Sequence, residues 1–597
     1  MIIEERADGA MIARNRHSLD AYPKKLTDRL VHWATVAPER IFLAQRKLDR
    51  TWRSITYGEF YSRIRRIGES LLRRKLSVDR PVAILSGNDI EQALLMFAAM
   101  HVGIPSAPIS PSYSLRVKEF SRLNAILDVL RPGMIFANSL NSFSKALQAV
   151  SIDGVELVTS ADCAHFVATP FNELEISNDS SAVDAASGEV NGDTIAKILF
   201  TSGSTGIPKG VINTQKMLCS NQKMIVSMLP CFEDAPPVTV DWLPWHHTFG
   251  GNHNLGLILY NGGTLYIDEG RPVPGAFATT VGNLCEISPT VYFNVPRGLE
   301  ELVIAMKCDE QLRKRFFSRI HLIFYAAASL SQDVRDDIES IAVETCGERI
   351  AFVSAFGSTE TAPSALCPVS QCDRAGFIGI PVPGVEVKLV PAGAKLELRL
   401  RGPNVTPGYW KEEAQTAAAF DEEGFYKIGD AVTFLDPAYP EEGFVFDGRL
   451  AENFKLSNGT WVSVGALRSR LVSHFAPLVL DAAITGHDRD EIGALLFLNL
   501  ELCRSTADLQ PNYPTGEIAS HVKVREVFRQ KLESFARMST GSSNRIARIV
   551  LLSLPPSLEA GEITDKGSLN QRATVASRAT SVAELYALNH SDHVITI

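Results

Sequence analysis

Hydrophobic and polar positions between residues 27 and 110 follow helical and strand patterns in turn. Leu26 to Ala37 is amphipathic at helical spacing, Ile55-Thr-Tyr57 opens a second helix, and Glu91 to Met100 predicts a third. Between the last two, Pro81-Val-Ala-Ile-Leu85 is a short apolar run that ends in Ser-Gly-Asn, as a buried strand does. A strand, a crossover helix and another strand in this order predict a parallel, doubly wound sheet.

The middle of the chain continues this pattern after a polar interruption. Residues 171 to 193 are rich in Asn, Asp, Ser and Gly, which predicts a surface linker that leads into a strand over Ile195 to Phe200. Thr214 to Leu229 predicts a helix, and a proline-rich stretch ends it. Two strictly alternating segments, Val385 to Val390 and Lys395 to Leu400, bracket Pro-Ala-Gly and predict a hairpin in a small antiparallel barrel.

From Arg449 onward the pattern changes to that of a compact α+β unit. Strands are expected at Leu478–Leu480 and Ala494–Leu498, and helices at Leu467–His474 and Val522–Phe535. The expected fold class is therefore α/β. It has a large N-terminal domain (residues 1–447) with doubly wound sheets and a small β-barrel, and a small mobile C-terminal α+β domain (residues 448–597).

Composition and charge exclude several classes of protein. Apolar residues make up 45% of the chain and charged residues 21%, as in ordinary globular proteins, and 597 residues are too many for one core. The net charge of -9 argues against a broad nucleic-acid surface. Nine cysteines without paired spacing are expected to be reduced thiols rather than zinc ligands. We expect a cytoplasmic protein, monomeric or homodimeric, without a membrane segment, because Met1-Ile-Ile-Glu-Glu-Arg6 does not resemble a signal peptide.

The segment Ile198-Leu-Phe-Thr-Ser-Gly-Ser-Thr-Gly-Ile-Pro-Lys-Gly210 places a hydroxyl- and glycine-rich loop directly after an apolar run. Backbone amides at the glycines can point at phosphate oxygens, while hydroxyls add donors and a lysine adds charge. The candidate phosphate-binding residues are Thr201, Ser202, Gly203, Ser204, Thr205 and Lys209. The spacing is not that of the Walker loop, which argues against a P-loop kinase. An ordinary Ser/Gly surface loop is the alternative for this segment alone.

Four further segments follow in a fixed order: Phe356-Gly-Ser-Thr-Glu360, Tyr426-Lys-Ile-Gly-Asp430, Asp447-Gly-Arg-Leu-Ala-Glu-Asn-Phe-Lys455 and Glu562-Ile-Thr-Asp-Lys-Gly567. With the loop, their order and spacing resemble the adenylate-forming enzyme superfamily, from about Leu26 to Ala587. Leu243-Pro-Trp-His-His-Thr-Phe-Gly-Gly251 and Phe293-Asn-Val-Pro-Arg-Gly298 look most like feruloyl-CoA synthases, as do Asn458 to Ser463 and Thr564 to Gln571.

The resemblance implies ATP, Mg²⁺ and coenzyme A as the small molecules that the protein uses. Glu360 is a hard oxygen ligand suited to Mg²⁺, and Thr359 is expected to donate to the α-phosphate. Phe356 stands where relatives commonly have a tyrosine against the adenine and keeps the stacking surface. The adenine side of the predicted site comprises Ala327, Ala328, Ser354, Ala355, Phe356 and Gly357. The alanines could equally belong to a plain helix.

Three charged residues complete the predicted nucleotide site. Asp430 can accept hydrogen bonds from both ribose hydroxyls, Arg449 adds donors, and Lys455 resembles a lysine that reaches the nucleotide or the pantetheine in one orientation of the C-terminal domain. Lys566 is the predicted catalytic lysine of adenylation, because an ammonium can neutralise charge that develops between the carboxylate and the α-phosphate. Relatives mostly place Gly directly before this lysine, and here Asp565 precedes it.

The resemblance implies an acid pocket centred on His247, which occupies the position of an aromatic residue or histidine that lines the acyl pocket in relatives, with His246 as the alternative. Gly250 and Gly251 are expected to leave room for a flat ring, and Trp245, Phe249, Tyr292 and Val295 to offer aromatic or apolar walls. This set favours an aryl or arylpropenoic acid over a long alkyl chain. A rotation of the C-terminal domain between the two half-reactions is a hypothesis, and Ala451 stands where relatives usually carry the hinge Asp or Lys.

The sequence is compatible with three functions. The leading one is an ATP-dependent acid:CoA ligase that activates ferulate or a related hydroxycinnamate through an acyl-AMP. The second passes an acyl group from the adenylate to a carrier protein. The third is a non-catalytic nucleotide-binding homologue. The residue pattern gives no reason to expect a nucleic-acid or membrane partner.

Overall fold

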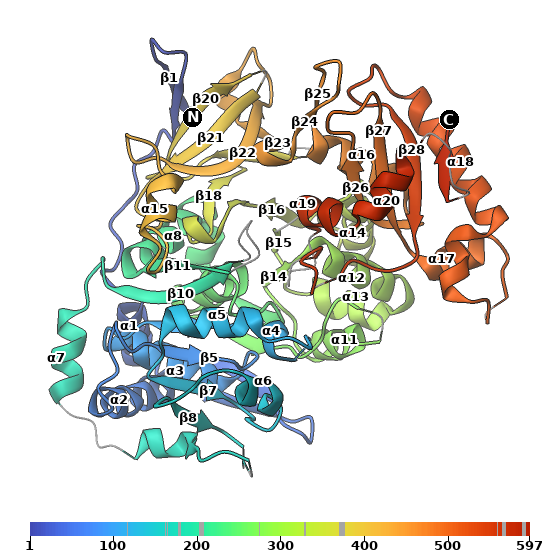
Figure 1. The fold of residues 1–597 in the computed structure, drawn as a ribbon. Coiled ribbons are helices and arrows are strands. Elements are labelled where there is room, and N and C mark those ends of the chain that lie inside the picture. Colours follow the sequence, from blue (N-terminus) through green and yellow to red (C-terminus); the bar gives the residue numbers. More distant parts are fainter. Residues whose placement is uncertain are drawn as a thin grey trace. The chain divides into compact units, whose positions relative to one another are not determined.

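The computed structural model describes residues 1–115, 117–161, 163, 165–176, 181–201, 208–273, 275–326, 330–368, 376–393, 395–510, 512–557, 559–563, 569–587 and 593–597 (Figure 1). Contacts divide the chain into two compact units. The first comprises Met1–Val390, Leu398–Ile428 and Phe434–Val445, and the second Pro391–Glu397, Gly429–Thr433 and Phe446–Ile597. Two strand segments that precede residue 447 therefore group with the second unit.

A seven-stranded sheet forms one part of the first unit. Its order is β11 (Lys209–Thr214), β10 (Ile195–Thr201), β6 (Ser106–Pro108), β5 (Val82–Ile84), β7 (Met134–Ala137), β8 (Glu156–Thr159) and β9 (Thr169–Pro170). Strand β5 pairs in parallel with β6 and with β7, and β7 pairs in parallel with β8. Strand β11 pairs antiparallel with β10. Because helices cover a parallel sheet on both faces, its central strands are apolar throughout, as in Val82-Ala-Ile84.

Two further sheets of the first unit are largely parallel. One has the order β12 (Val238–Asp241), β13 (Thr264–Ile267), β3 (Ile41–Arg46) and β4 (Trp52–Thr56), and the other β14 (Val291–Asn294), β15 (Leu322–Tyr325) and β16 (Ala351–Ser354). Hydrogen bonds between Val238 and Thr290 join the start of β12 to the segment before β14. Because β14, β15 and β16 pair in parallel, their carboxyl ends meet at one edge of the sheet. Ligands bind at this edge in sheets of this kind.

The helices of the first unit start where the sequence supplies caps. Thr56 accepts from the backbone of Glu59, whose side chain bonds back to Thr56, so a capping box begins α2. Asp89 caps α3, whose residues are all buried except Glu91, and this burial explains the apolar character of the helix. The helices are α1 (Thr27–Val36), α2 (Tyr57–Arg73), α3 (Ile90–His101), α4 (Ser112–Leu115), α5 (Ser121–Leu130), α6 (Ser144–Ala149), α7 (Ser181–Glu189), α8 (Gln215–Met228), α9 (Cys231–Asp234), α10 (Leu255–Tyr260), α11 (Phe277–Glu286), α12 (Pro296–Cys308), α13 (Glu310–Phe317), α14 (Gln332–Cys346) and α15 (Glu413–Ala419).

The sequence predicts only a surface linker over residues 171–193, but part of that segment is a helix that packs on the core. Helix α7 occupies Ser181–Glu189, and Val183 is fully buried in the main core. Lys25 donates to the carbonyl and the hydroxyl of Ser187, which ties the helix to the start of α1. Alanines between the polar residues favour a helix, and Val183 packs it against the core.

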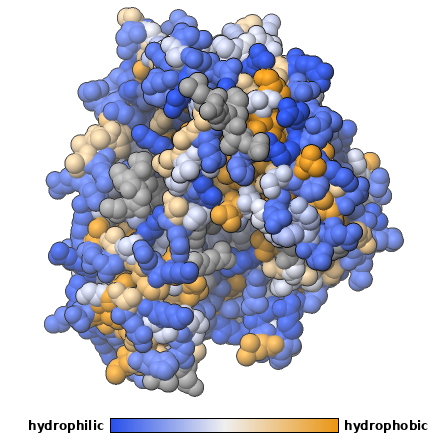
Figure 2. Space-filling view, turned by 45° about the vertical axis from the view of Figure 1, so that its right-hand side comes forward, coloured by the Kyte–Doolittle hydropathy of each residue, from blue (hydrophilic) through white to orange (hydrophobic). Residues whose placement is uncertain are grey.

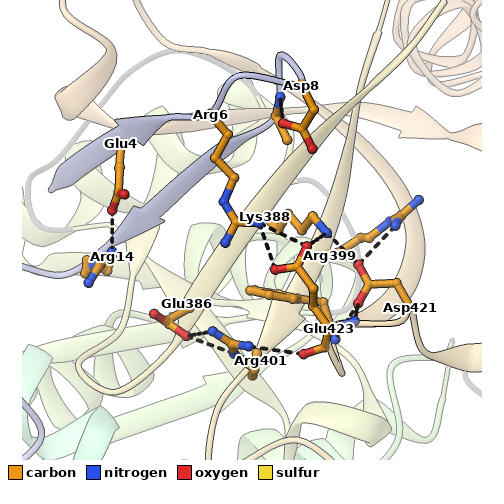
Figure 3. Close-up of polar contacts among 12 residues, drawn as sticks. Glu4, Arg6, Asp8, Arg14, Glu386, Lys388, Arg399, Arg401, Asp421 and Glu423 are labelled. Carbon is orange, nitrogen blue, oxygen red and sulfur yellow. Dashed lines mark hydrogen bonds and ion pairs between the residues drawn. The ribbon is translucent and has the colours of Figure 1, made fainter.

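The predicted hairpin lies in a nine-stranded sheet. The order is β1 (Ile2–Glu5), β2 (Met11–Arg14), β20 (Glu386–Ala392), β21 (Lys395–Arg401), β22 (Tyr426–Phe434), β23 (Phe444–Arg449), β19 (Phe377–Pro381), β18 (Ser364–Cys367) and β17 (Phe356–Gly357). A charge cluster braces it, as Figure 3 shows: Lys388 contacts Asp421 at 3.0 Å, and Arg399 contacts the same carboxylate at 3.1 Å. Burial alone would raise the pKa of Asp421, but the Phe425 amide and these cations hold it at about 2.

The second unit has its own core and sheet. The sheet order is β26 (Val479–Thr485), β27 (Ile492–Leu498), β28 (Ile546–Leu552) and β29 (Val594–Thr596), and a small hairpin pairs β24 (Phe454–Lys455) with β25 (Trp461–Val462). Its helices are α16 (Val464–Phe475), α17 (Leu500–Thr506), α18 (Val522–Arg537), α19 (Gln571–Ser577) and α20 (Ala579–Leu585). The predicted strands and helices of this region are confirmed, with shifts of a few residues at their ends.

The surface drawn in Figure 2 is mostly hydrophilic, with hydrophobic side chains in small patches. Within the described ranges, no helix combines the length and the hydropathy that a membrane span requires. The described cysteines, which exclude Cys372, are all free thiols.

Candidate active site

Strands β10 and β11 form the hairpin that carries the predicted phosphate loop. Thr201 ends β10 and pairs with Lys209, the first residue of β11. Ser202, Gly203, Ser204 and Thr205 lie outside the described residues. The hairpin nevertheless fixes both ends of the loop, because the two strands are paired along their length.

A second segment, Thr406 to Trp410, lies along β11. The Ile212 amide donates to the Gly408 carbonyl at 3.2 Å, and the Trp410 amide donates to the Gly210 carbonyl at 2.7 Å. These bonds place the ring of Tyr409 under the Lys209 ammonium, 4.9 Å from Nζ to the ring centroid. A cation over an aromatic face is attracted by the ring quadrupole, so Lys209 is directed toward this segment.

Glu360 contacts the same tyrosine. The Tyr409 hydroxyl donates to Glu360 Oε1 at 3.1 Å, and the Thr406 amide donates to the Glu360 carbonyl at 2.8 Å. Burial raises the pKa of Tyr409, and the carboxylate of Glu360 raises it further, so the phenol stays a neutral donor. Lys209 and Glu360, 151 positions apart in the sequence, thus flank one aromatic ring.

Buried amides hold the short turn Thr359–Thr361 that presents Glu360. Asn404 Nδ2 donates to the carbonyls of Thr361 and Ser364, at 2.9 Å and 3.0 Å, and Asn221 Nδ2 also donates to Ser364, at 2.7 Å. Just before the turn, a β-carbon at Gly357 would lie 1.8 Å from the Pro363 carbonyl oxygen, so only glycine allows this crossing. Thr359 is buried in the turn.

The predicted adenine side lies at the carboxyl edge of the three-stranded parallel sheet. Ser354 ends β16 beside Tyr325, which ends β15, and Ala355 leads into Phe356 of β17. Phe356 is half-buried and pairs with Leu366 of β18. Ala327 and Ala328 lie outside the described residues, although Tyr325 places the start of their segment at this edge.

Asp430 and Arg449 come together in the second unit. Asp430 is 5% exposed, and Arg449 Nε lies 3.5 Å from its Oδ1. Among the described residues, this oxygen accepts no hydrogen bond. Burial raises the pKa of Asp430 to about 6; Arg449 opposes the increase and Glu452 adds to it. A buried acceptor oxygen without a donor fits a ligand that supplies hydroxyl groups, as a ribose does.

The raised pKa of Asp430 predicts that the affinity for ATP depends on pH. The ribose hydroxyls are donors, so ATP should bind best to ionised Asp430, and the KM for ATP should rise as the pH falls through about 6. In Asp430→Asn we expect a KM for ATP about tenfold higher at neutral pH and no inflection near pH 6, with the KM for the acid unchanged. Steady-state kinetics between pH 5 and pH 8 measure both. An inflection that persists in the asparagine variant would assign the titration to another group.

Lys455 and Lys566 belong to the second unit as well. Lys455 is exposed, with Nζ 5.0 Å from the ring centroid of Trp461. Lys566 lies outside the described residues, but its segment is bracketed by a bridge between Ile563 and Leu569. Glu562 anchors the base of this segment: burial would raise its pKa, yet Arg578, Ser577 and the Ser557 amide hold the pKa at about 2.

Most of the predicted acid-binding residues lie on one segment of the first unit, shortly after β12, whereas Tyr292 lies on β14 and Val295 follows it. His246 and His247 are half-buried neighbours with ring centroids 4.3 Å apart. His247 precedes a wide π-helical turn, Thr248–Asn254, and its carbonyl accepts from the Gly251 amide at 2.8 Å. Phe249 is 9% exposed and packs toward Phe324 and His253.

The glycines of this segment serve a purpose different from the one expected. A β-carbon at Gly250 would lie 2.4 Å from the Leu243 carbonyl oxygen, and one at Gly251 would lie 2.1 Å from that of Trp245. The space that they leave is thus filled by the backbone of Leu243 to Trp245, and not by a ring of the substrate. Trp245 itself is fully buried and forms part of the main core.

Phe293, and not the predicted Tyr292, belongs to the same hydrophobic cluster as Phe249. Tyr292 is fully buried in a separate cluster with Phe316, and its hydroxyl accepts from Asn294 at 2.9 Å. Its neighbour Phe293 points to the other face of β14 and joins Phe249, His253 and Phe324. Successive side chains of a strand point to opposite faces, so Phe293 takes the place that we expected for Tyr292. Val295 is half-buried against the same cluster.

His253 adds a neutral polar group to this aromatic cluster. Burial lowers the pKa of His253 to about 4, and its Nδ1 lies 2.8 Å from Asn254 Oδ1. The ring stacks 4.4 Å from Phe324. The four rings of Phe249, His253, Phe293 and Phe324 are thus buried, and they pack against one another behind the segment that carries His247.

The residues present fit a magnesium ion that arrives with a nucleotide. Within the described ranges, no three His, Cys, Asp or Glu side chains converge on a metal site. Mg²⁺ is usually held by one or two carboxylates together with phosphate oxygens and water. The half-buried carboxylate of Glu360, with one oxygen bonded by Tyr409, matches that requirement.

Reasoning from the sequence missed Tyr409, Phe293 and the buried amides Asn221 and Asn404. Tyr409 gave only a weak signal, an aromatic residue directly after Pro407-Gly408. Phe293 stood next to the residue that was chosen. The two asparagines occupy ordinary helix and loop contexts, so no local pattern distinguishes them.

Luciferin 4-monooxygenase of Photuris pensylvanica is 24% identical over 522 residues, which cover 84% of this chain and 90% of that protein. The 4-coumarate–CoA ligase 3 of Arabidopsis thaliana is 24% identical over 460 residues, which cover 74% and 76% of the two chains. An anthranilate CoA ligase crystallised with anthranoyl-AMP superposes with a TM-score of 0.70 at 18% identity, over 95% of this chain and 99% of that one.

The structural match confirms the predicted α/β fold with a large N-terminal and a smaller C-terminal domain. The closer resemblance to feruloyl-CoA synthases stays a prediction. The model of the AMP-binding enzyme family matches residues 30–410, which is more than half of the chain. The chain therefore belongs to the AMP-binding enzyme family, whose members form adenylates.

Proposed function

We propose that the protein is an ATP-dependent acid:CoA ligase that activates an aromatic carboxylic acid, ferulate or a related hydroxycinnamate, as its acyl-AMP and transfers the acyl group to coenzyme A. The observation that carries this proposal is the grouping of Glu360, Tyr409 and Lys209 at the end of the phosphate-loop hairpin. A carboxylate and an ammonium beside such a loop are what a nucleotide triphosphate with its metal requires.

The chemistry explains why these groups are needed. A carboxylate does not react with a thiol because its leaving group would be oxide or hydroxide. Attack of the acid on the α-phosphorus of ATP converts it to a mixed anhydride with AMP as the leaving group, and pyrophosphate departs. Such a phosphoryl transfer is accelerated mainly by positioning and charge stabilisation. Magnesium, when bound, neutralises charge on the phosphates.

The residues of the candidate site each have a part in this scheme. Glu360 would hold the metal, with its carboxylate oriented by the Tyr409 hydroxyl. Thr201, Lys209 and Thr359 would contact the phosphates, and Asp430 would accept from the ribose hydroxyls. Lys566 would supply the ammonium at the reacting carboxylate.

The names of two relatives and the aromatic cluster beside the predicted acid-binding segment support an aryl acid. Phe249, Phe293 and Phe324 surround His253, and Val295 adds an apolar contact. The names of two relatives, a 4-coumarate–CoA ligase and an anthranilate CoA ligase, describe proteins that act on planar aromatic acids.

A direct assay tests the proposed function. The purified protein is incubated with ATP, Mg²⁺, CoA and one acid from a panel of hydroxycinnamates, benzoates and alkanoates. We expect AMP, pyrophosphate and a thioester, with the highest kcat/KM for ferulate or a close analogue. Formation of ADP, or no product with any acid, would contradict the proposal. A holo-carrier protein in place of CoA forms the comparison arm, and a preference for it would make the protein a carrier-loading enzyme.

A further inference from the structure

Lys197 is a buried lysine without an acidic partner among the described residues. It lies in the middle of β10, is 1% exposed, and belongs to the largest fully buried side chains. Burial lowers its pKa to about 7. Buried lysines are normally paired with a carboxylate, as Lys388 is with Asp421. An apolar residue would suit a central strand better, so this position carries a polar group for a reason other than packing.

The ammonium reaches the backbone of the acid-binding segment. Lys197 Nζ donates to the Gly251 carbonyl at 3.0 Å and to Asn252 Oδ1 at 3.4 Å. Asn213, the direct cross-strand partner of Lys197 on β11, accepts from Asn252 Nδ2 at 2.8 Å. The two strands that carry the phosphate loop therefore each present a polar side chain to Asn252, and Lys197 also bonds Gly251.

The turn that receives these bonds needs side-chain donors. In the π-helical turn Thr248–Asn254 the backbone is wider than in an α-helix, and such turns are frequent at functional sites. Two consecutive carbonyls receive donors from outside: that of Gly251 from Lys197, and that of Asn252 from Gln222 of α8, at 2.7 Å. Asn252 also bonds Thr248 Oγ1 at 3.1 Å, which closes the turn on itself.

We propose that Lys197 is a positioning residue for the acid substrate, because it fastens the turn that carries His247 and Phe249 to the hairpin that carries the phosphate loop. Gly251 connects His247 to Lys197. Its amide donates to the His247 carbonyl, and its own carbonyl accepts from the Lys197 ammonium. The inference rests on the proposed function, in which this segment binds the acid and the hairpin binds ATP.

The placement predicts an effect on one substrate more than on the other. Without the lysine, the Gly251 carbonyl has lost its donor, and the turn relaxes away from the hairpin. The hairpin itself keeps its backbone pairing, because the bonds between β10 and β11 do not involve the lysine side chain. The acid should therefore bind more weakly while ATP binds as before.

The test compares Lys197→Met with Gln222→Met and with the wild type. Methionine fills the space of each side chain and removes the donor. We expect the KM for ferulate to rise about tenfold in Lys197→Met and in the same direction in Gln222→Met, with the KM for ATP within twofold of wild type. Hydrogen exchange of a peptide that spans residues 246–256 should be faster in both variants.

Lys388→Met is the matched control, because it removes another buried lysine of the first unit, away from this segment. It should lower the thermal midpoint and leave both KM values unchanged. An unchanged KM for the acid in Lys197→Met, or a rise of the same size for ATP, would overturn the inference. So would the same rise in Lys388→Met.

The exchange measurement separates this inference from the proposed function. If the wild type activates no acid in the panel, the proposed function fails. The positioning role is then decided by exchange alone: faster exchange at residues 246–256 in Lys197→Met supports it, and unchanged exchange overturns it.

Discussion

Lys566→Ala should lower the rate of acyl-AMP formation by about 10²- to 10³-fold and spare thioester formation from supplied acyl-AMP. The ammonium is needed only while charge develops between the carboxylate and the α-phosphate, and that step is complete once the adenylate exists. Acid-dependent pyrophosphate exchange measures the first half-reaction. Thioester formation from synthetic feruloyl-AMP and CoA measures the second.

The control for this prediction is Lys523→Ala, which removes an exposed lysine from α18 in the same unit. Both half-reactions should proceed there at the wild-type rate. An equal loss of both half-reactions in Lys566→Ala would show that the lysine acts on folding or on CoA transfer as well, and would contradict the role given to it.

Glu360→Gln should reduce adenylation by about 100-fold and shift the magnesium dependence to higher concentration. Glutamine keeps the size of the side chain and can still accept from the Tyr409 hydroxyl, so the turn Thr359–Thr361 should stay folded. It lacks the negative charge that a hard divalent cation prefers. Initial rates at a series of free Mg²⁺ concentrations measure the change.

Tyr409→Phe is the companion variant, because it keeps the carboxylate and removes one hydroxyl that donates to it. We expect a smaller loss, about tenfold, with little change in the magnesium requirement. If Glu360→Gln required no more magnesium than the wild type, the metal role of Glu360 would be wrong, and its interaction with Tyr409 would be structural only.

Much of the fold follows from local patterns. The helices α1, α3 and α8 begin and end within a few residues of the predicted positions, and α2 begins where it was predicted, because caps and apolar periodicity act over one or two turns. Helix α7, within the predicted linker, was missed because its single buried valine gives no periodic signal. Contact with the core, rather than local preference, decides whether such a short segment is helical.

The candidate site divides in the same way. Motifs with an unusual composition, such as Thr201 to Lys209 and Phe356 to Glu360, were visible because the chemistry of phosphates and metals requires particular residue types close together. Tyr409 was not visible, since its partner Glu360 lies 49 residues away. The same holds for Lys197, which reads as an isolated lysine in a strand until the Gly251 carbonyl is placed beside it.

By itself the sequence determined the α/β class and the order of the motifs, as well as the residue types that can bind a nucleotide and its metal. Only the tertiary structure decided that Phe293 and not Tyr292 faces Phe249, and that backbone fills the space beside Gly250 and Gly251. It also decided that Lys197 and Gln222 hold the turn after His247. The physical reason is that residue chemistry is local, whereas the face on which a side chain lies and the backbone that it meets depend on segments distant in the sequence.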